Sequence, residues 1–539
     1  MDARIVEPSP GAARGTRLQG AAEGAPTEHG SSVEWLTAHP FLLWWGVSLL
    51  LAILSAIVWP TVPSYDPFSW VVWGREVTDP HISFFIGGGP SWKPLPFLFT
   101  TVYGLFGQAA PTLWVITARA GGIAGLIGAW RLAALLCSRA GLPRTAGWVA
   151  GVVAAAGVVL TIDWTYYFFR GTSETLLIGV FLWAIDRLLA GRHWQAYVLL
   201  AAEGLMRPEA WPFLLVYGAW LFWRMPGMRV WVVLGLLAQP VGWFVPPWIS
   251  TGQPFLAAVH AEEYNGQLGS NPFATVMARG EGLQPLPALL LGAVAVLLAV
   301  WFARDRLRRE LPVAWRTRGR EGLAAVPLEV WLAVIVVGWW VVVVAMTLDG
   351  YPGLQRFFLP AAAVTCVVGG TGLVWVAVLA GRLLAGRLLR ASGAAAAGLA
   401  ALVVAALLAG SYHYVAPRIT FVRQQEPLAA LAVQRIDQLG QAISVLGGRS
   451  AILPCPSSLL TINHSLQTAL AWKLGTTLER VHTVLTAPGL AFVGPHDSID
   501  GGVPPILFKF TPHLIRTVGA WKIYVVDRYG QATPRCVGS

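Results

Sequence analysis

The chain has 539 residues, of which 55% are hydrophobic and only 12% are charged. A soluble chain of this length would carry about a quarter charged residues, so the composition excludes an ordinary soluble enzyme. The formal net charge is +11, yet no basic stretch is interleaved with aromatic residues for base stacking, which argues against a nucleic-acid partner. Basic loops between membrane spans explain the excess of positive charge.

The N-terminal segment 1–35 is rich in Gly, Ala, Pro, Ser and Glu and poor in large apolar residues. This composition predicts a disordered N-terminus. The segment lacks the short apolar stretch and the cleavage site of a signal peptide, so the first apolar run is expected to stay as a membrane anchor.

Apolar runs of about twenty residues, the length that crosses the hydrocarbon core of a bilayer, recur from residue 36 to residue 411. They predict an α-helical polytopic membrane protein with about eleven transmembrane helices. The runs lie near 41–60, 112–136, 145–162, 173–190, 194–206, 210–224, 229–248, 285–303, 326–347, 357–380 and 393–411. The fifth and sixth runs are interrupted by Arg207, Pro208 and Glu209.

The charges of the loops predict the orientation of these spans. One set of loops is basic: it holds Arg139, Arg144, Arg187, Arg192, Arg224, Arg229, Arg382, Arg387, Arg390 and the stretch 304–320. The other set gathers the acids Asp66, Glu76, Asp79, Asp163, Glu174, Glu262, Glu263 and Asp349. The positive-inside rule places the basic loops and the N-terminus in the cytoplasm, and the tail after residue 411 outside.

The first outer loop, 61–111, is long and has its own pattern. It begins with Tyr65-Asp66-Pro67-Phe68 and continues with the glycine-rich segment 87–96, which contains Trp92-Lys93-Pro94. The following apolar stretch, 95–107, is too short to cross a bilayer. Its aromatic residues suit a helix that lies in the membrane interface.

These features, in this order, resemble the GT-C membrane glycosyltransferases, in particular the branch of protein O-mannosyltransferases and lipid A aminoarabinose transferases. The resemblance covers about residues 41–380. It is carried by Asp66 after the first span, the segment Lys93-Pro94-Leu95-Pro96, Leu105-Phe106-Gly107, Arg119, Ser173-Glu174, and Asp349 with Arg356-Phe357-Phe358-Leu359-Pro360. Actinobacterial arabinofuranosyl- and mannosyltransferases that use polyprenyl-phosphate sugars also add an extracytoplasmic C-terminal domain.

The resemblance implies transfer of a sugar from a polyprenyl phosphate to an acceptor hydroxyl. Such a reaction needs a carboxylate that takes the hydroxyl proton and cations that hold the departing phosphate. Asp66 is the candidate base, although an aspartate before proline also starts turns. Lys93 is the only lysine before Lys473, which suggests a phosphate contact by a compact ammonium. Alternatively, it lies at the interface with its ammonium in water.

Arg207 and Arg356 are further candidate phosphate ligands, because an uncompensated cation at the end of a span is costly. Simple ion pairs with Glu209 and Asp349 would also explain them. Asp163 matches the second acidic position of many GT-C enzymes, where it would orient the acceptor or share a divalent ion with Asp66. A helix-terminal aspartate explains it equally well.

Glu174, Glu209, His260 and Asp349 are further candidates for contacts with the sugar or the acceptor. His260 stands near Glu262 and Glu263, and such a mixture can bind a divalent metal, although two adjacent carboxylates on one segment point apart. A Mg²⁺ or Mn²⁺ requirement stays open. Trp92 stands where the aminoarabinose transferases carry an acidic residue, which weakens a metal site inferred from that branch.

The tail, 412–539, changes pattern from about Glu426. Helical stretches at 427–443 and 465–474 alternate with short apolar runs at 451–453, 491–493 and 523–526, which predicts a small extracytoplasmic α/β domain. The domain would serve as a lid or bind the acceptor glycan. Cys455 and Cys536 lie in this tail, where a disulfide is chemically permitted, whereas Cys137 and Cys366 are expected in the apolar core.

The expected function is that of an inverting glycosyltransferase of the bacterial inner membrane, transferring a hexose or pentose. Its partners would be the lipid bilayer, a polyprenyl-phosphate sugar, and a glycan, lipid or protein acceptor of the cell envelope. A transporter or flippase of a lipid-linked sugar is the main alternative, and it predicts charges deep inside the spans and repeated halves. A non-catalytic scaffold for glycan assembly is the third possibility.

Overall fold

The structure is a computed structural model. It describes residues 40–90, 92–262, 269–317, 326–389, 393–453, 459–485, 488–496, 503–507 and 510–527. The chain divides into Met1–Leu43 and Trp44–Ser539, and every contact discussed in the following paragraphs lies within the second part.

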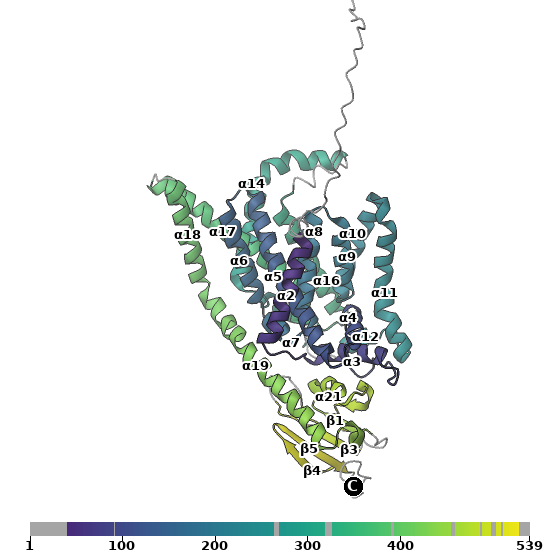
Figure 1. The fold of residues 1–539 in the computed structure, drawn as a ribbon. Helices are drawn as coiled ribbons and strands as arrows, with labels where there is room; N and C mark the ends of the chain where they lie inside the picture. The colour runs from purple at the N-terminus through teal and green to yellow at the C-terminus, as the bar shows by residue number, and fades with distance from the viewer. Residues whose placement is uncertain are drawn as a thin grey trace, which may run out of the picture. The chain divides into compact units, whose positions relative to one another are not determined.

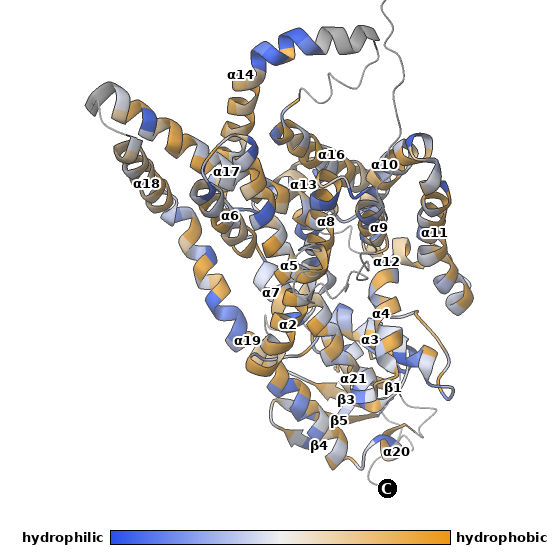
Figure 2. Ribbon diagram, turned by 45° about the horizontal axis from the view of Figure 1, so that its top comes forward, coloured by the Kyte–Doolittle hydropathy of each residue, from blue (hydrophilic) through white to orange (hydrophobic). Residues whose placement is uncertain are grey.

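Helices occupy all eleven of the predicted apolar runs (Figure 1). They are α2 (Pro40–Val58), α5 (Ala110–Arg139), α6 (Arg144–Val159), α8 (Ser173–Leu189), α9 (His193–Gly204), α10 (Trp211–Arg224), α11 (Arg229–Thr251), α14 (Leu286–Thr317), α16 (Leu328–Leu348), α17 (Leu359–Leu383) and α18 (Gly393–Gly410). Figure 2 shows how apolar residues dominate most of these helices, while polar residues gather in a stretch of α14 before its grey end and along much of α19 (Tyr412–Val445).

Fewer than eleven of the described helices are long and apolar enough to cross a membrane. Among the described residues, seven helical stretches are long and apolar enough to cross, or eight if the bent pair of α6 and α7 (Trp164–Arg170) is one span. The two helices of that pair meet at 73°. With 17, 12 and 14 residues, α8, α9 and α10 are shorter than a full crossing needs. Eleven crossings therefore remain a prediction, although all eleven helices exist.

Shorter helices connect the long ones. They are α3 (Tyr65–Thr78), α4 (Pro94–Gly104), η1 (Gly107–Ala109), η2 (Pro208–Ala210), η3 (Pro226–Met228), α12 (Leu256–Glu262), α13 (Pro272–Glu281), η5 (Gln355–Phe358) and η6 (Leu384–Leu389). The predicted short helix of the first outer loop is confirmed as α4. Pro94 begins it, as expected for a residue whose missing N–H would have no partner in the first turn.

Helices α5 and α8 pack with their backbones almost in contact, because glycines line the α5 face and Gly179 of α8 lies opposite one of them. A Cβ atom added to Gly179 of α8 would stand 2.2 Å from the carbonyl oxygen of Gly121 in α5. Close approach through glycine is a common way to pack helices in a membrane, where apolar burial drives little association. This pair positions the N-terminus of α8, which carries Glu174.

Replacing Gly179 by Leu is expected to separate α5 from α8 and to reduce the yield of folded protein severely. Gly398 of α18 has no heavy atom within 4 Å of an added Cβ, so Gly398→Leu is the matched control. Size-exclusion profiles and thermal unfolding in detergent measure the effect. Equal behaviour of the two variants would contradict the close α5–α8 packing.

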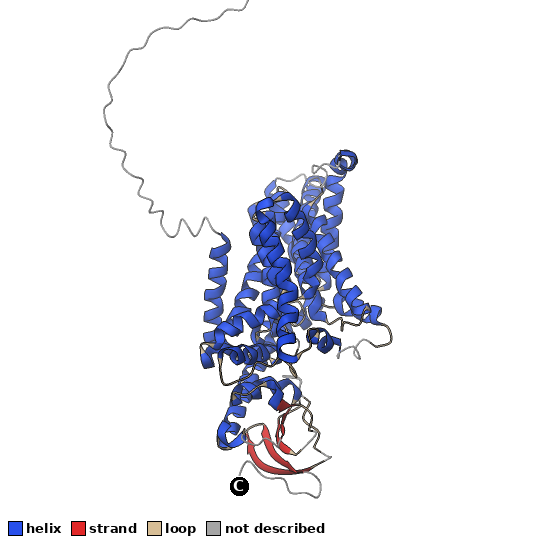
Figure 3. Cartoon of the chain, turned by 90° about the vertical axis from the view of Figure 1, so that its right-hand side faces the viewer, coloured by secondary structure: helices blue, strands red, loops and turns tan. Residues whose placement is uncertain are grey.

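The C-terminal part combines helices with a five-stranded sheet (Figure 3). Its elements after α19 are α20 (Arg449–Ile452), β1 (Leu459–Ile462), η7 (His464–Leu466), α21 (Gln467–Leu474), η8 (Leu478–Arg480), β2 (Val481–His482), β3 (Gly489–Val493), β4 (Thr511–Val518) and β5 (Trp521–Asp527). The strand order is β2-β1-β3-β5-β4. β1 pairs with β2 and β3 in parallel, while β5 pairs with β3 and β4 antiparallel.

The predicted α/β character of the tail is confirmed, with one error. The apolar run 451–453 was expected as a strand, but Ala451 and Ile452 belong to the helix α20. Gly447 and Gly448 end α19 with positive φ angles, and the next residues start a new helical turn whose Ile452 is buried. Cys137 and Cys366 are buried, as expected, whereas Cys455 and Cys536 lie outside the described residues.

Helix α21 packs on α3 of the first loop. The Arg75 guanidinium of α3 donates to the carbonyl oxygens of Trp472 (3.1 Å) and Thr476 (2.7 Å). The Gln467 amide donates to the Gly88 carbonyl at 2.9 Å, and Tyr65 donates to the Gln467 side-chain oxygen at 3.0 Å. The C-terminal part thus supports the helix that begins beside Asp66.

Candidate functional site

Lys93 is fixed by the residues on both sides of it. The Trp92 indole is buried and donates to the Gly242 carbonyl at 3.0 Å, and the Leu95 N–H donates to the Leu205 carbonyl at 3.1 Å. The Lys93 ammonium is buried as well and donates to Ser173 Oγ at 2.7 Å and to Glu174 Oε1 at 3.2 Å. Burial lowers the pKa of this ammonium to about 8.

Glu174 is the shared counter-ion of three cations. Its side chain is 1% exposed and lies in the first turn of α8, near the positive end of the helix dipole. Oε1 accepts from Lys93 and, at 2.5 Å, from the Arg207 guanidinium, while the Arg356 guanidinium stands at 4.0 Å. We call Lys93, Arg207 and Arg356 the cation cluster.

Asp66 stands next to this cluster at the start of α3. Its Oδ2 accepts from the Arg356 guanidinium at 3.0 Å, and its side chain is 20% exposed, which leaves it open to a ligand. The expected alternative, an ion pair of Arg356 with Asp349, does not form among the described contacts of Arg356. Asp349 is exposed at the end of α16.

Arg207 enters the cluster from the break between α9 and α10. It is buried, and its guanidinium lies 4.6 Å from the centre of the Phe357 ring. Its distance to Glu209 Oε1 is 4.0 Å, longer than its 2.5 Å contact with Glu174. The interruption of the apolar pattern at 207–209 therefore corresponds to the turn between α9 and α10, which positions the Arg207 guanidinium beside Glu174.

The structure does not bring every predicted residue to this cluster. The ion pairs and hydrogen bonds described for the cation cluster involve neither Asp163 nor Asp349, nor His260 on α12. Glu209 is fully buried beside Arg207. Within the described ranges, no group of three or more His, Cys, Asp or Glu side chains could hold a metal ion. The residues present therefore do not form a recognisable metal site around Asp66.

Some contributors had no role assigned to them from the sequence. Ser173 accepts from Lys93, the Trp70 ring lies 5.3 Å from the Lys93 ammonium, and Phe357 lies under Arg207. Ser173 and Phe357 adjoin the predicted Glu174 and Arg356, so adjacency was a usable signal for them. Nothing in the sequence pairs Trp70 with Lys93, because their proximity depends on how α3 and α4 pack.

The arrangement combines cations of fixed position with a partly exposed carboxylate. Lys93 and Arg207 make charge-assisted hydrogen bonds to the buried Glu174 carboxylate, and Arg356 makes one to Asp66. An anionic oxygen that reached the cluster would find these donors already oriented, which is the condition for electrostatic stabilisation of a leaving group. The adjacent Asp66 is able to accept a proton.

Comparisons with known proteins give a limited result. No protein-family model matches the chain, and no curated protein sequence matches it. The structure is similar to that of ArnT from Cupriavidus metallidurans bound to undecaprenyl phosphate, with 14% identity over 94% of this chain and 100% of that chain and a TM-score of 0.45. It is also similar to that of ArnT from Cupriavidus metallidurans in the apo state, with 13% identity over 90% of this chain and 98% of that chain and a TM-score of 0.42. The proposed function therefore rests on the residues of this chain.

Proposed function

We propose that the chain is a membrane glycosyltransferase that moves a sugar from a polyprenyl phosphate to an acceptor hydroxyl. The observation that carries this proposal is the convergence of Lys93, Arg207 and Arg356 on Glu174, with Asp66 held by Arg356. The carboxylate would take the proton of the acceptor hydroxyl, and the cations beside it would hold the departing phosphate. The sequence resemblance to GT-C enzymes falls on four of these five residues, Asp66, Lys93, Glu174 and Arg356.

The reaction would proceed in one displacement. The acceptor oxygen attacks the anomeric carbon as its proton passes to Asp66, and the bond between that carbon and the phosphate oxygen breaks. The bonding electrons leave with the polyprenyl phosphate, whose added charge the cation cluster stabilises. Attack from the face opposite the phosphate inverts the anomeric configuration.

The proposed enzyme works at the extracytoplasmic face of the bacterial inner membrane. This sidedness is supported by the loop charges, which by the positive-inside rule favour the outer side for Asp66, Glu174 and the tail. The acceptor is a hydroxyl of a cell-envelope glycan, lipid or protein, and the sugar is a hexose or a pentose. The C-terminal domain would then stand outside the membrane, where it packs on the helix that carries Asp66.

A donor panel tests this proposal. Purified protein is incubated with polyprenyl-phosphate mannose, arabinofuranose, glucose and galactose and with an extract of envelope glycans and lipids. Mass spectrometry should show free polyprenyl phosphate and a glycosylated product from one donor. If every donor is recovered unchanged, while a known transferase consumes its donor under the same conditions, the proposal is wrong.

Donor affinity is expected to fall as the pH rises past about 8. Burial lowers the Lys93 pKa to about 8, so the ammonium loses its proton there, while the phosphodiester of the donor keeps its charge. Arginine stays protonated over this range, so Lys93→Arg should bind more weakly overall but without this pH step. Titration of the Kd of the polyprenyl-phosphate sugar between pH 6.5 and 9.5 measures both proteins. An identical step in Lys93→Arg would assign it to another group.

A further inference from the structure

Helix α14 is longer than a membrane crossing requires. Its 32 residues span about 48 Å at about 1.5 Å per residue, whereas the hydrocarbon core of a bilayer is about 30 Å thick. Figure 1 shows α14 turning near its end, and Figure 2 shows that the polar stretch, in blue, lies beyond the turn and across the end of the bundle. A polar, basic stretch in this orientation is typical of a helix at a membrane surface.

A groove lies along α14 at this turn, and a single face of the helix lines it. Its volume is about 720 Å³. Most of the lining residues follow the spacing of three and four that places side chains on one helix face. They are Val294, Leu297, Leu298, Val300, Trp301, Arg304, Asp305 and Arg308. The first five are apolar and the last three are charged, so one end of the groove suits a hydrocarbon chain and the other an ionic group.

Trp301 and Arg304 meet where the apolar end of the groove joins the charged end. The centre of the Arg304 guanidinium lies 4.1 Å from the centre of the Trp301 ring. Tryptophan at such a boundary is typical of a membrane interface. The ring contacts the guanidinium through a cation–π interaction, and the N–H groups at the edge of the planar guanidinium are suited to bidentate donation to a phosphate.

Asp305 neutralises this site only weakly. Its Oδ1 lies 3.8 Å from Arg304 Nε, and the two side chains are 67% and 45% exposed. Exposed ion pairs of this kind contribute little free energy. An anionic ligand can therefore compete for the Arg304 guanidinium.

The polar stretch of α14 carries an excess of positive charge. Residues 304–310 hold four arginines and two acids, a net charge of +2, and residues 311–320 add three arginines and no acid. The positive-inside rule favours the cytoplasmic face for such a stretch, and the cytoplasmic leaflet attracts basic segments through its anionic lipids. Charge complementarity thus favours an anionic headgroup over a zwitterionic one.

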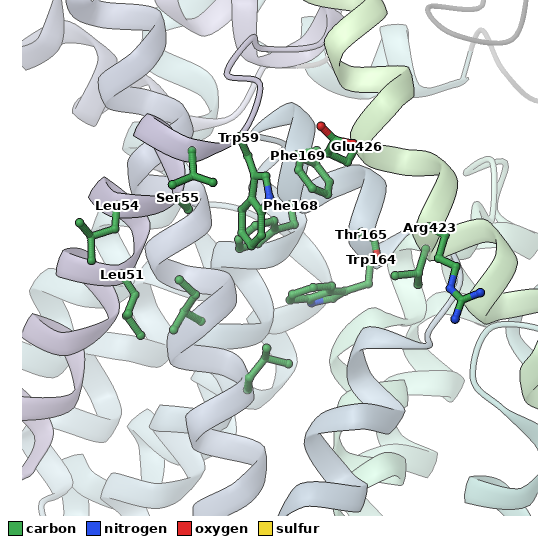
Figure 4. Close-up of a pocket in the computed structure, with 14 residues that line it drawn as sticks. Leu51, Leu54, Ser55, Trp59, Trp164, Thr165, Phe168, Phe169, Arg423 and Glu426 are labelled. Carbon is green, nitrogen blue, oxygen red and sulfur yellow. The ribbon is translucent and has the colours of Figure 1, made fainter.

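Two other apolar grooves lack this excess of positive charge. One lies between α2, α5, α7 and α19 (Figure 4) and has a volume of about 670 Å³; its charged lining residues, Arg423 and Glu426, have opposite signs. The other, of about 560 Å³, is lined mainly by α13 and α16, and its lining contains no charged residue. Hydrocarbon chains fit both grooves, but neither has a net charge that would select an anionic headgroup.

We propose that the groove at the turn of α14 binds an anionic phospholipid of the cytoplasmic leaflet. The phosphate diester accepts hydrogen bonds from Arg304 and Arg308, which lie one helical turn apart, and an acyl chain lies along Leu297 and Trp301. The bound lipid holds the polar stretch of α14 at the membrane surface. None of these residues belongs to the cation cluster, so the inference does not depend on the proposed transferase function.

Native mass spectrometry of the full chain released from detergent tests the inference. The probes are dioleoyl phosphatidylglycerol, dioleoyl phosphatidylcholine and glycerol phosphate. Phosphatidylglycerol should bind at least about tenfold more tightly than phosphatidylcholine, and equimolar glycerol phosphate should not displace it. Equal affinity for the two lipids would overturn the proposal. Displacement by glycerol phosphate would show that the ligand is a soluble anion and would also overturn it.

Matched arginine variants locate the bound lipid. Arg304→Gln and Arg308→Gln should each weaken phosphatidylglycerol binding about fivefold, and together about 25-fold, the usual contribution of one and two arginines at an anionic surface. The control is the double variant Arg192→Gln and Arg224→Gln, which removes two exposed arginines from other basic loops. It should change the affinity by less than about twofold. Equal losses in the two double variants would assign the binding to general attraction by basic loops and refute the α14 site.

Discussion

Asp66→Asn is expected to lower kcat by about 10²- to 10⁴-fold, the usual contribution of a positioned general base. The amide has the size of the carboxylate but cannot accept the proton of the acceptor hydroxyl. Donor binding should change little, because Lys93 and Arg207, which contact Glu174 rather than Asp66, remain in place. Turnover of the identified donor, followed by mass spectrometry, measures the loss.

The matched control for Asp66 is Asp349→Asn, which changes an exposed aspartate at the end of α16. It should retain most of the activity, because the described contacts of Asp349 do not include the cation cluster. Both variants should elute as folded monodisperse protein in detergent. Near-normal turnover by Asp66→Asn would remove Asp66 from its proposed role and leave the fold untouched.

Glu174→Gln is expected to destabilise the protein by about 3–5 kcal/mol, as breaking a buried ion pair does. Glu174 is 1% exposed, and it supplies the carboxylate that Lys93 and Arg207 contact directly. Its loss leaves these buried cations without their common partner. Thermal unfolding in detergent measures the change. Glu281→Gln, exposed at the end of α13, is the control and should unfold like the unaltered protein.

Glu174→Gln also tests whether the cation cluster binds phosphate or only stabilises the fold. Polyprenyl phosphate would bring back a negative charge, so it should raise the Tm of Glu174→Gln by more than it raises that of the unaltered protein. A purely structural cluster would give equal shifts or none. Equal shifts would therefore show that the phosphate does not bind at the cation cluster.

The helices were predictable from the sequence because uninterrupted apolar runs leave little choice in a bilayer. All eleven ranges and the short helix α4 follow from this pattern alone. The number of crossings does not, because α9 and α10 are short helices that turn at Arg207. The strand expected at 451–453 was also missed, because three apolar residues have no periodicity that distinguishes a strand from a helical turn.

The candidate site was predictable in part. Arg207 and Arg356 were singled out because an uncompensated cation at the end of a span is costly. Asp66, Lys93 and Glu174 were singled out by the motifs that resemble GT-C enzymes, and Lys93 also as the only lysine before Lys473. Their pairing was not predictable. Arg356 contacts Asp66 across 290 residues of sequence rather than the nearby Asp349, and only the packing of α3, α8 and η5 creates that contact. The proximity of α19 to Asp163, with which it lines a pocket, was hidden for the same reason.

The most direct test of the central claim is a single-turnover reaction in proteoliposomes with the donor that the panel identifies, labelled in both sugar and lipid. The account predicts one free polyprenyl phosphate for each sugar transferred, and an inverted anomeric configuration in the product by NMR. If the intact lipid-linked sugar instead crosses the bilayer with its phosphate bond unbroken, the protein is a transporter and the account is contradicted.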